Sequence, residues 1–208
     1  MNRSTMRTLL AKRLQDNAED QFSTSDLNSL LNLGLGLLQA DVMAVRPDAF
    51  VEISTFSIVA SQDRYVNPEG WLLDIMIEVV DTAEASGYRK LSPVPFQQKF
   101  TDGDSITHYS HMGRFLVLSP TPDVAVSDGI RRTWVPTLTM DDDADIPEIK
   151  AVLHSCIVDY AVIEAIGETD EAGDSTYKRL QRKLERVSDI YGRVTAGQLY
   201  SLVPNVAR

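Results

Sequence analysis

An acidic turn followed by a long apolar stripe, in residues 141–167, sets the strongest condition on the fold. Asp145 is the predicted N-cap of a helix, Glu148 is placed to close a capping box, and Pro147 falls in the first turn. We expect this helix to end at Gly167 and to carry one apolar face made of Ile149, Val152, Leu153, Cys156, Tyr160 and Ile163. Such a face has to pack against a second apolar helix.

Two helices are predicted near the start of the chain. The first covers Thr5–Asn17, and the second begins at Ser23, where Asp26 completes a capping-box pattern, and ends near Arg46. The apolar stripe of the second helix comprises Leu27, Leu30, Leu31, Leu35, Leu38, Val42 and Val45. Gly34 and Gly36 interrupt it. The third glycine of a dinucleotide fingerprint would stand at position 39, which is glutamine, so we interpret both glycines as sites of close helix packing.

The hydrophobic period changes to two at about residue 50, which predicts strands. They are expected at residues 51–59, 64–66, 72–80, 106–109, 114–118, 124–126 and 130–135. Residues 67–70 and 101–105 are predicted as turns, Met112–Gly113 as a hairpin turn, and residues 87–99 as a loop with a short helix. Short strands between frequent turns predict an antiparallel sheet, a sandwich or a small barrel.

A last helix is predicted over Ser175–Tyr191, and residues 193–208 follow as an apolar tail without a period. The apolar stripe of this helix is thin, which favours a helix laid against a neighbouring chain. The candidate partner interface therefore combines this helix with the tail: Tyr177, Arg179, Leu180, Arg182, Lys183, Leu184, Val187, Tyr191, Leu199, Tyr200, Leu202, Val203 and Pro204.

These segments predict an α+β fold. Residues 1–48 and 139–172 form a helical bundle, and residues 49–138 form an antiparallel β-domain inserted between its two parts. Residues 173–192 form an embracing helix, and residues 193–208 form an extended tail.

The net charge of −10 is unevenly distributed. Residues 173–208 hold seven Lys or Arg and three Asp or Glu, so the rest of the chain carries −14. An acidic body argues against ordinary nucleic-acid binding, which requires clustered cations. The basic C-terminal part fits either a solvated helix face or contact with an acidic partner. The sequence shows neither a leader peptide nor an apolar run long enough to span a membrane.

No arrangement of residues amounts to a catalytic, cofactor or metal site, although the Asp141–Asp145 cluster invites a metal hypothesis. Cys156, the single cysteine, lies on the predicted apolar face as a structural thiol, which fits a reducing compartment. His108 and His111 are predicted as exposed hairpin residues, and His154 as a packed helix residue. Asp141–Asp145 resemble the start of a calcium loop, but the expected glycine and glutamate are Ile146 and Val152, which favours helix capping.

The order of several motifs resembles a known family. The motifs are Tyr65–Pro68 at a strand end, Gly113–Pro122 at a hairpin exit, Val135–Asp145 at a strand end with an acidic turn, and the helix start at Ile146–Pro147. Over roughly residues 5–172 the chain resembles the head-to-tail adaptor proteins of tailed bacteriophages, chiefly short-tailed ones, also called connector or gateway proteins.

The resemblance implies a virion protein without catalysis, made in the host cytoplasm. Such adaptors form a ring, usually of twelve copies, below the portal protein. The ring extends the DNA channel, through which genomic DNA passes without specific binding, and carries the tail nozzle or hub. Two alternatives stay open: a neck or head-completion protein of the siphophage type, and a metal-dependent hydrolase that uses Asp141–Asp145.

Overall fold

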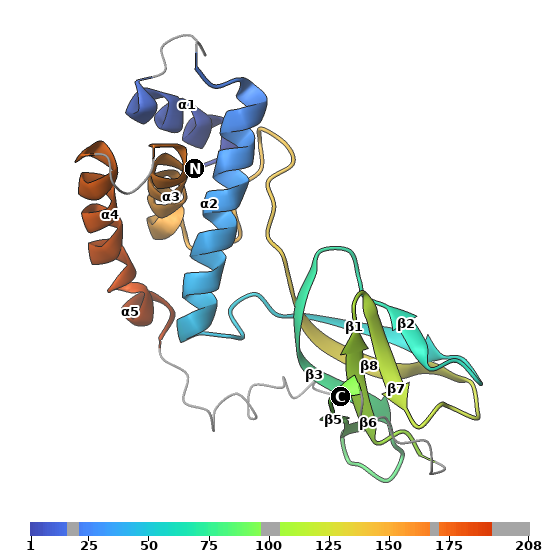
Figure 1. Cartoon of the computed structure of the whole chain (residues 1–208). Helices are drawn as coiled ribbons and strands as arrows, with labels where there is room; N and C mark the ends of the chain where they lie inside the picture. The colour runs from blue at the N-terminus through green and yellow to red at the C-terminus, as the bar shows by residue number, and fades with distance from the viewer. Residues whose placement is uncertain (16–20, 97–104, 167–170, 193–208) are drawn as a thin grey trace. The chain divides into compact units, whose positions relative to one another are not determined.

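The structure is a computed structural model that describes residues 1–15, 21–96, 105–166 and 171–192 (Figure 1). It divides into two compact units, one made of Met1–Ala49 with Leu138–Arg208 and the other of Phe50–Thr137. The described helices of four or more residues lie in the first unit and the two sheets in the second. The predicted α+β fold is therefore confirmed.

The helical unit is built around its third helix. α3 (His154–Ile166) contacts α1 (Arg3–Leu14), α2 (Thr24–Val45) and α4 (Glu171–Leu184), while α5 (Val187–Tyr191) contacts α2. Figure 1 shows α3 between α2 and α4. Buried apolar side chains from these helices and from the loop before α3 form the core, among them Met6, Leu10, Leu31, Leu35, Leu38, Met140, Leu153, Ile157 and Val158.

The start of α2 agrees with the sequence pattern. Ser23 caps the helix by accepting a hydrogen bond from the Asp26 amide, and the Asp26 carboxylate accepts one from the Ser23 amide, so the predicted capping box is confirmed. The predicted stripe is buried at five positions, whereas Leu30 and Val45 are half-buried. α1 begins two residues earlier than predicted, because the Asn2 side chain caps it by accepting from the Thr5 amide at 2.9 Å.

The predicted start of the central helix at Asp145 is wrong. The chain stays irregular to Lys150, passes through the short helical turn η2 (Ala151–Leu153), and enters α3 at His154. The Asp145 carboxylate accepts hydrogen bonds from the backbone amides of Asp141 and Asp142, at 2.7 Å each, so it closes the loop behind it. Val152 is 67% exposed and does not belong to the apolar face. The predicted end at Gly167 lies outside the described residues.

Gly34 lets α2 and α3 approach closely. A Cβ atom at this position would lie 2.5 Å from the Ile157 carbonyl oxygen and 3.2 Å from the Ala161 amide nitrogen. The prediction of close packing is thus confirmed for Gly34. It is wrong for Gly36, where a Cβ atom would meet nothing within 4 Å.

The β unit consists of two four-stranded sheets, ordered β1-β8-β3-β4 and β2-β7-β6-β5. Pairing is antiparallel except between β5 and β6. The strands are β1 (Glu52–Ile58), β2 (Arg64–Val66), β3 (Trp71–Val80), β4 (Tyr88–Lys90), β5 (Ser92–Pro93), β6 (His108–Met112), β7 (Phe115–Ser119) and β8 (Val126–Pro136). Apolar side chains of both sheets form one core, which includes Ile58, Tyr65, Ile77, Val79, Leu91, Leu116, Leu118 and Ile130.

Two parts of this unit differ from the prediction. Residues 88–90 and 92–93 form strands where a loop with a short helix was expected, because Leu91 between them donates to the Ile77 carbonyl of β3. The last two predicted strands are the single strand β8, which shifts its register against β1 instead of turning. The hairpin turn at Met112–Gly113 is confirmed, with Gly113 in the left-handed region at φ 57°. Most of the predicted 101–105 turn lies outside the described residues.

Candidate partner interface

The predicted interface helix is two helices, α4 and α5, and part of its stripe packs on its own chain. Leu180 and Val187 are each only 1% exposed. Leu184 is half-buried, and Tyr177 is 37% exposed. The thin stripe therefore already covers part of the helical unit to which it belongs.

A buried carboxylate fixes α4 to this unit. Asp159 of α3 is fully buried and accepts hydrogen bonds from Arg179 at 2.7 Å and from Lys183 at 2.6 Å. Arg13 of α1 also pairs with the same carboxylate. Two of the cations that the sequence assigned to a partner interface thus bind within the unit. Asp159 could not be identified from sequence patterns, because one acidic residue on an apolar helix has no distinguishing pattern.

Tyr191 is anchored at the end of α5. Its hydroxyl accepts a hydrogen bond from the Lys150 amide at 3.1 Å, and the Lys150 ammonium group lies 4.8 Å from the centre of its ring. The Tyr191 carbonyl accepts from the Arg46 guanidinium at 2.9 Å, next to the C-terminal end of α2. The last described residues are therefore held beside that end of α2.

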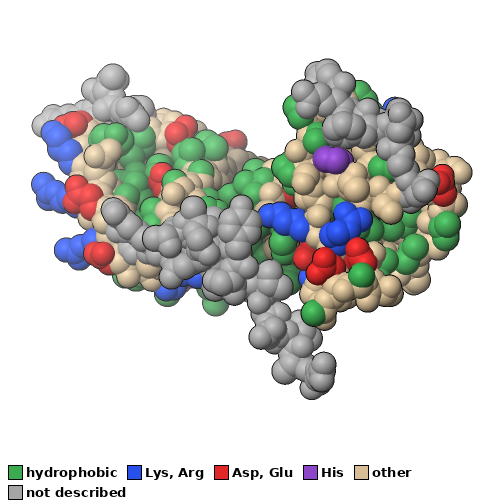
Figure 2. Space-filling view, turned by 90° about the horizontal axis from the view of Figure 1, so that it is seen from below, with side chains coloured by type: hydrophobic (Ala, Val, Ile, Leu, Met, Phe, Trp, Pro, Cys, Tyr) green, Lys and Arg blue, Asp and Glu red, His purple; other side chains and the backbone are tan. Residues whose placement is uncertain are grey.

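The outward face of α4 mixes both signs of charge. Acidic and basic side chains alternate in groups, because Asp174, Lys178 and Arg182 lie on α4 and Glu185 and Arg186 follow in the turn before α5, and all five are exposed. Figure 2 shows Lys and Arg side chains next to acidic ones along the outer edge of the helical unit, where α4 runs. Such alternation is typical of a helix face in contact with water. Leu199, Tyr200, Leu202, Val203 and Pro204 lie outside the described residues.

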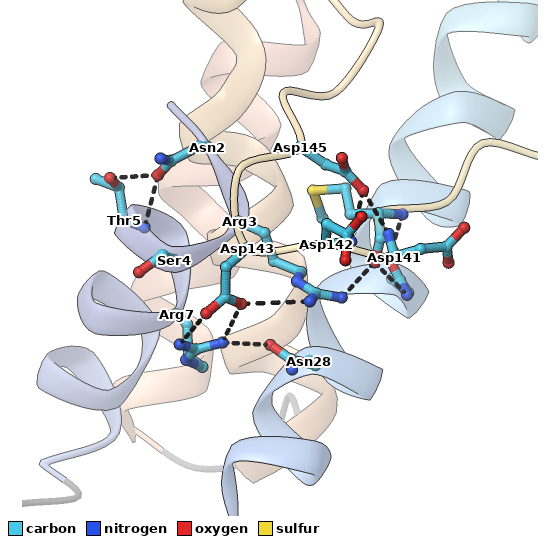
Figure 3. A network of polar contacts seen from close by, with 12 residues as sticks. Asn2, Arg3, Ser4, Thr5, Arg7, Asn28, Asp141, Asp142, Asp143 and Asp145 are labelled. Atoms are coloured by element: carbon cyan, nitrogen blue, oxygen red, sulfur yellow. Dashed lines mark hydrogen bonds and ion pairs between the residues drawn. The ribbon is translucent and has the colours of Figure 1, made fainter.

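The acidic loop before α3 binds the start of α1 (Figure 3). The Asp143 carboxylate accepts hydrogen bonds from Arg7 at 2.7 and 3.0 Å and from Arg3 at 3.3 Å. The Asp145 and Asp143 carbonyls accept from the amides of Arg3 and Ser4, which lie at the first turn of α1. The loop therefore supplies acceptors to a helix start that would otherwise lack them.

These contacts account for two carboxylates of the cluster that suggested a metal site. The hydrogen bond from Arg7, together with Arg3, lowers the pKa of Asp143, so its charge is matched by cations of the chain itself. Across residues 1–15, 21–96, 105–166 and 171–192, no group of three His, Cys, Asp or Glu side chains is arranged to hold a metal ion. The structure gives no support to a hydrolase centred on Asp141–Asp145.

Cys156 and His154, the residues of α3 with the most reactive side chains, are buried in the helical unit. Burial raises the pKa of the Cys156 thiol to about 11, so it stays protonated and poorly nucleophilic at neutral pH. The ring of His154 is buried, with Nε2 2.8 Å from the Ile149 carbonyl and Nδ1 2.6 Å from the Met1 nitrogen. Both residues match their predicted structural roles.

A buried polar network holds the β unit together. Arg132 and Asp74 have side chains only 2% exposed, and they form two hydrogen bonds of 2.5 and 2.8 Å. Arg132 also donates to the Asn67 side chain at 2.9 Å, and its guanidinium lies 5.6 Å from the centre of the Trp71 ring. His111 is exposed, as predicted, but its Nε2 lies 3.0 Å from Asp74, so it also takes part in this network, whereas His108 is half-buried rather than exposed.

The network connects segments that are far apart in the sequence. Asn67 follows β2, Asp74 lies in β3, His111 in β6 and Arg132 in β8. Burial alone would raise the pKa of Asp74, but hydrogen bonds from His111 and Arg132 outweigh this effect and lower it. One of the segments that carry the family resemblance, Tyr65–Pro68, therefore contributes Asn67 to this network.

Among the described helices, none combines the length and the apolar character that crossing a bilayer requires.

The comparison with known families covers almost the whole chain. The family model described as SU10 adaptor protein matches residues 1–204. Among curated proteins, none matches the chain. With its α+β fold and its adaptor-like order of motifs, the chain belongs to the SU10 adaptor protein family, the structural adaptors of bacteriophages.

Proposed function

We propose that this protein is the head-to-tail adaptor of a short-tailed bacteriophage. Copies of the chain form a ring, usually of twelve in the proteins it resembles, which binds below the portal and carries the tail nozzle or hub. The observation that carries the proposal is the match of residues 1–204 to an adaptor family. The protein is then a virion component at the head–tail interface.

The charge distribution supports a channel role. The chain carries −10 overall, and −14 before residue 173. A negative surface repels the phosphate backbone, so DNA passes through such a ring without being held. Of the basic residues from 173 onward, Arg179 and Lys183 bind Asp159 within the unit, and the exposed Arg182 and Arg186 are positioned for contacts with acidic surfaces of other proteins.

The proposed interface has an exposed part and an anchored part. Tyr177, whose hydroxyl accepts a hydrogen bond from Gln181, and Arg182 are exposed to a neighbouring subunit. Leu180 and Val187 keep α4 and α5 folded on their own bundle. The tail contributes the apolar residues from Leu199 to Pro204. Contacts between two different surfaces of one chain close into a ring, as the proposed assembly requires.

Deletion of residues 192–208 tests the proposal. We expect the shortened chain to keep its helical circular dichroism spectrum and to lose binding to the portal protein of the same phage in a pull-down. The full chain mixed with that portal should form rings, which can be counted by electron microscopy. Portal binding by the shortened chain would remove the tail from the interface, and failure of the full chain to bind portal would contradict the proposed function.

A second electron-microscopy observation separates the two phage alternatives. In the proposed function, the ring below the adaptor is a tail nozzle or hub. A neck protein of the siphophage type would instead be followed by a tail tube. Images of virions that contain this chain distinguish the two arrangements.

A further inference from the structure

The sheet ordered β1-β8-β3-β4 ends at β1. This strand pairs with β8 on one side, and no other described strand lies against its second side. Alternate residues of an edge strand point their backbone N–H and C=O groups away from the sheet, where another strand can bind them. A register shift after Phe56 limits the regular part to residues 52–56, which we call the β1 edge. Glu52, Ile53 and Thr55 are exposed there.

The other edge strands of the β unit are protected in the ways that natural sheets use against unwanted pairing. β2 and β4 have three residues each, and they carry Arg64 in one case and Arg89 with Lys90 in the other. β5 has two residues, and one of them is Pro93, which has no amide to donate. β1 has seven residues, and Glu52 is its only charge. Among the described edges, the β1 edge is therefore the best suited to bind a further strand.

A row of side chains on the outer face of this sheet stops at Ile53. Directly opposite residues of neighbouring strands point to the same face. Ile53 lies opposite Thr133 of β8, and Thr133 lies opposite Met76 of β3. Because nothing continues the row beyond β1 among the described strands, Ile53 stays 52% exposed, whereas Thr133 is buried.

A second row stops at Phe56 on the face that covers the core. Phe56 lies opposite Ile130, and Ile130 lies opposite Val79. Ile130 and Val79 are buried in the core of the β unit, whereas Phe56 is only partly buried against it. A strand added beside β1 would extend both rows by one side chain each. Apolar cross-strand pairs of this kind stabilise a sheet.

The β1 edge also has a charge preference. β1 contains no Lys or Arg. Glu52 is exposed, and its carboxylate has no hydrogen-bond or ion-pair partner among the described residues. A basic side chain directly opposite Glu52 would form an opposite-charge cross-strand pair, whereas an acidic one would be repelled.

From these observations we propose that the β1 edge binds an extended segment of another protein, which becomes a fifth, antiparallel strand of this four-stranded sheet. The segment carries apolar side chains opposite Ile53 and Phe56 and a basic side chain opposite Glu52. Its backbone supplies most of the affinity, and these three positions select its sequence. The inference concerns the β unit and does not depend on the proposed function.

A second copy of this chain fits the β1 edge less well. The other described edge strands have at most three residues, so only the β1 edge of that copy is long enough. In a symmetric antiparallel pair, the register that sets Ile53 opposite Ile53 leaves Phe56 opposite position 50, which precedes the strand. The registers that shift the strands the other way set Ile53 opposite Thr55 or Ser57 and interrupt the outer row. A segment of a different protein has no such restriction.

Hydrogen exchange of the full chain with a designed peptide tests the proposal. The peptide acetyl-Ser-Ile-Thr-Thr-Val-Lys-amide, bound antiparallel, places Ile opposite Phe56, Val opposite Ile53 and Lys opposite Glu52. If it occupies the β1 edge nine-tenths of the time, exchange of the outward-facing amides in residues 52–56 slows about tenfold. Replacing Lys by Glu in the peptide should weaken this protection.

Two matched controls separate strand addition from other binding. Two versions of the peptide are N-methylated at alternate residues: the version that lacks the amides facing β1 should not protect the edge, and the other should. In the chain, Ile53→Lys should abolish protection because it places a charge in the outer row. Val124→Lys, which replaces an apolar residue that is 69% exposed and lies outside the strands, should preserve it.

Four outcomes would overturn the inference. An edge whose exchange the peptide does not slow does not bind a strand. Equal protection by both N-methylated versions, or protection that persists in Ile53→Lys, would show that the peptide binds in another way. Slow exchange of the β1 edge without peptide would assign it to another part of the chain, or to a second copy if dilution removes the protection. Portal protein is absent from these measurements, so each outcome is separate from a failure of the proposed function.

Discussion

The residues with the greatest effect on this fold are buried charges that the hydrophobic pattern does not mark. Arg132 and Asp74 are among them, with side chains 2% exposed. A buried ion pair contributes little net stability as a pair, but removing one partner leaves an unmatched charge in the interior. Asp74 keeps a second partner in His111, and Arg132 keeps one in Asn67.

Arg132→Leu should destabilise the β unit by about 3–5 kcal/mol, since the Asp74 carboxylate would stay buried without its main cation. The double variant Asp74→Leu with Arg132→Leu should lose much less, because both charges disappear together. Urea unfolding of the two variants and the original chain measures the difference. If the single and double variants unfolded at the same urea concentration, the pair would not act as described.

The pH dependence of stability should reflect the ion pair between Asp74 and Arg132. The hydrogen bonds from His111 and Arg132 hold the pKa of Asp74 in the folded chain below its ordinary value of 3.8. Its contribution is then complete above the unfolded pKa and is lost as pH falls through the lower folded value. In Asp74→Asn the stability should fall less steeply between pH 5 and pH 3, each roughly one unit from that ordinary value. Parallel pH profiles of the melting temperature would contradict this expectation.

At the scale of elements, the packing of helices on α3 depends on small size at one position and on charge at another. Gly34 permits the close approach of α2, and Asp159 binds cations from α1 and α4. One contact is steric and the other electrostatic, so they can be tested separately.

The two glycines of α2 give a matched test of close packing. Gly34→Ala should destabilise the helical unit, because the new methyl group would lie 2.5 Å from the Ile157 carbonyl oxygen and force α2 away from α3. Gly36→Ala meets no atom within 4 Å and should stabilise the chain by about 0.5–1 kcal/mol through helix propensity. Thermal melts of both variants test this difference. If the two melting temperatures shifted in the same direction, the assignment of close packing to Gly34 alone would be wrong.

Asp159→Asn tests the attachment of α4. The substitution removes the charge that Arg13, Arg179 and Lys183 share, and should cost about 3 kcal/mol, at the low end of the range because those cations are partly exposed. Hydrogen exchange in residues 171–184 should accelerate while α2 stays protected. Asp174→Asn, which breaks only the exposed pair with Lys178, serves as the control. Unchanged exchange in α4 would show that its apolar contacts suffice.

At the scale of the whole molecule, each unit has its own core. The described core cluster of the β unit lies between residues 56 and 130, and the buried polar network lies between 67 and 132. The helical unit depends on segments from both ends of the chain, since α3 contacts α1 and α2.

Residues 50–137 should therefore fold alone, whereas residues 1–49 should not, because α2 would lose α3 as its partner. A cooperative thermal transition with a strand-type circular dichroism spectrum is expected for the first fragment, and a coil-like spectrum for the second. A β fragment that melts without cooperativity would show that the helical unit is needed to complete it.

Much of this architecture follows from local patterns. The capping box at Ser23, the apolar period of α2 and the turn at Gly113 are set by neighbouring residues, and all three have the predicted form. Two predictions were wrong because the local sequence was compatible with more than one backbone structure. Asp145 caps its own loop instead of a helix, and residues 88–93 become strands only because β3 and β6 lie beside them.

The predicted interface residues likewise fall into two groups: those that local patterns identify and those whose contacts depend on distant residues. Composition and spacing identified α4 and the tail as the segments that differ from the body of the chain, and this depends on sequence alone. Whether Arg179 and Lys183 face a partner depends on Asp159, which lies at least 20 residues away in the chain. The contact of His111 with Asp74 and that of Gly34 with Ile157 likewise join residues that are far apart in the sequence. The sequence by itself determined most of the elements, the α+β class and the family, because each rests on short-range patterns or their order. Only the tertiary structure decided which buried charges meet and which strand lies at the edge of its sheet, because those contacts join residues that no periodic pattern links.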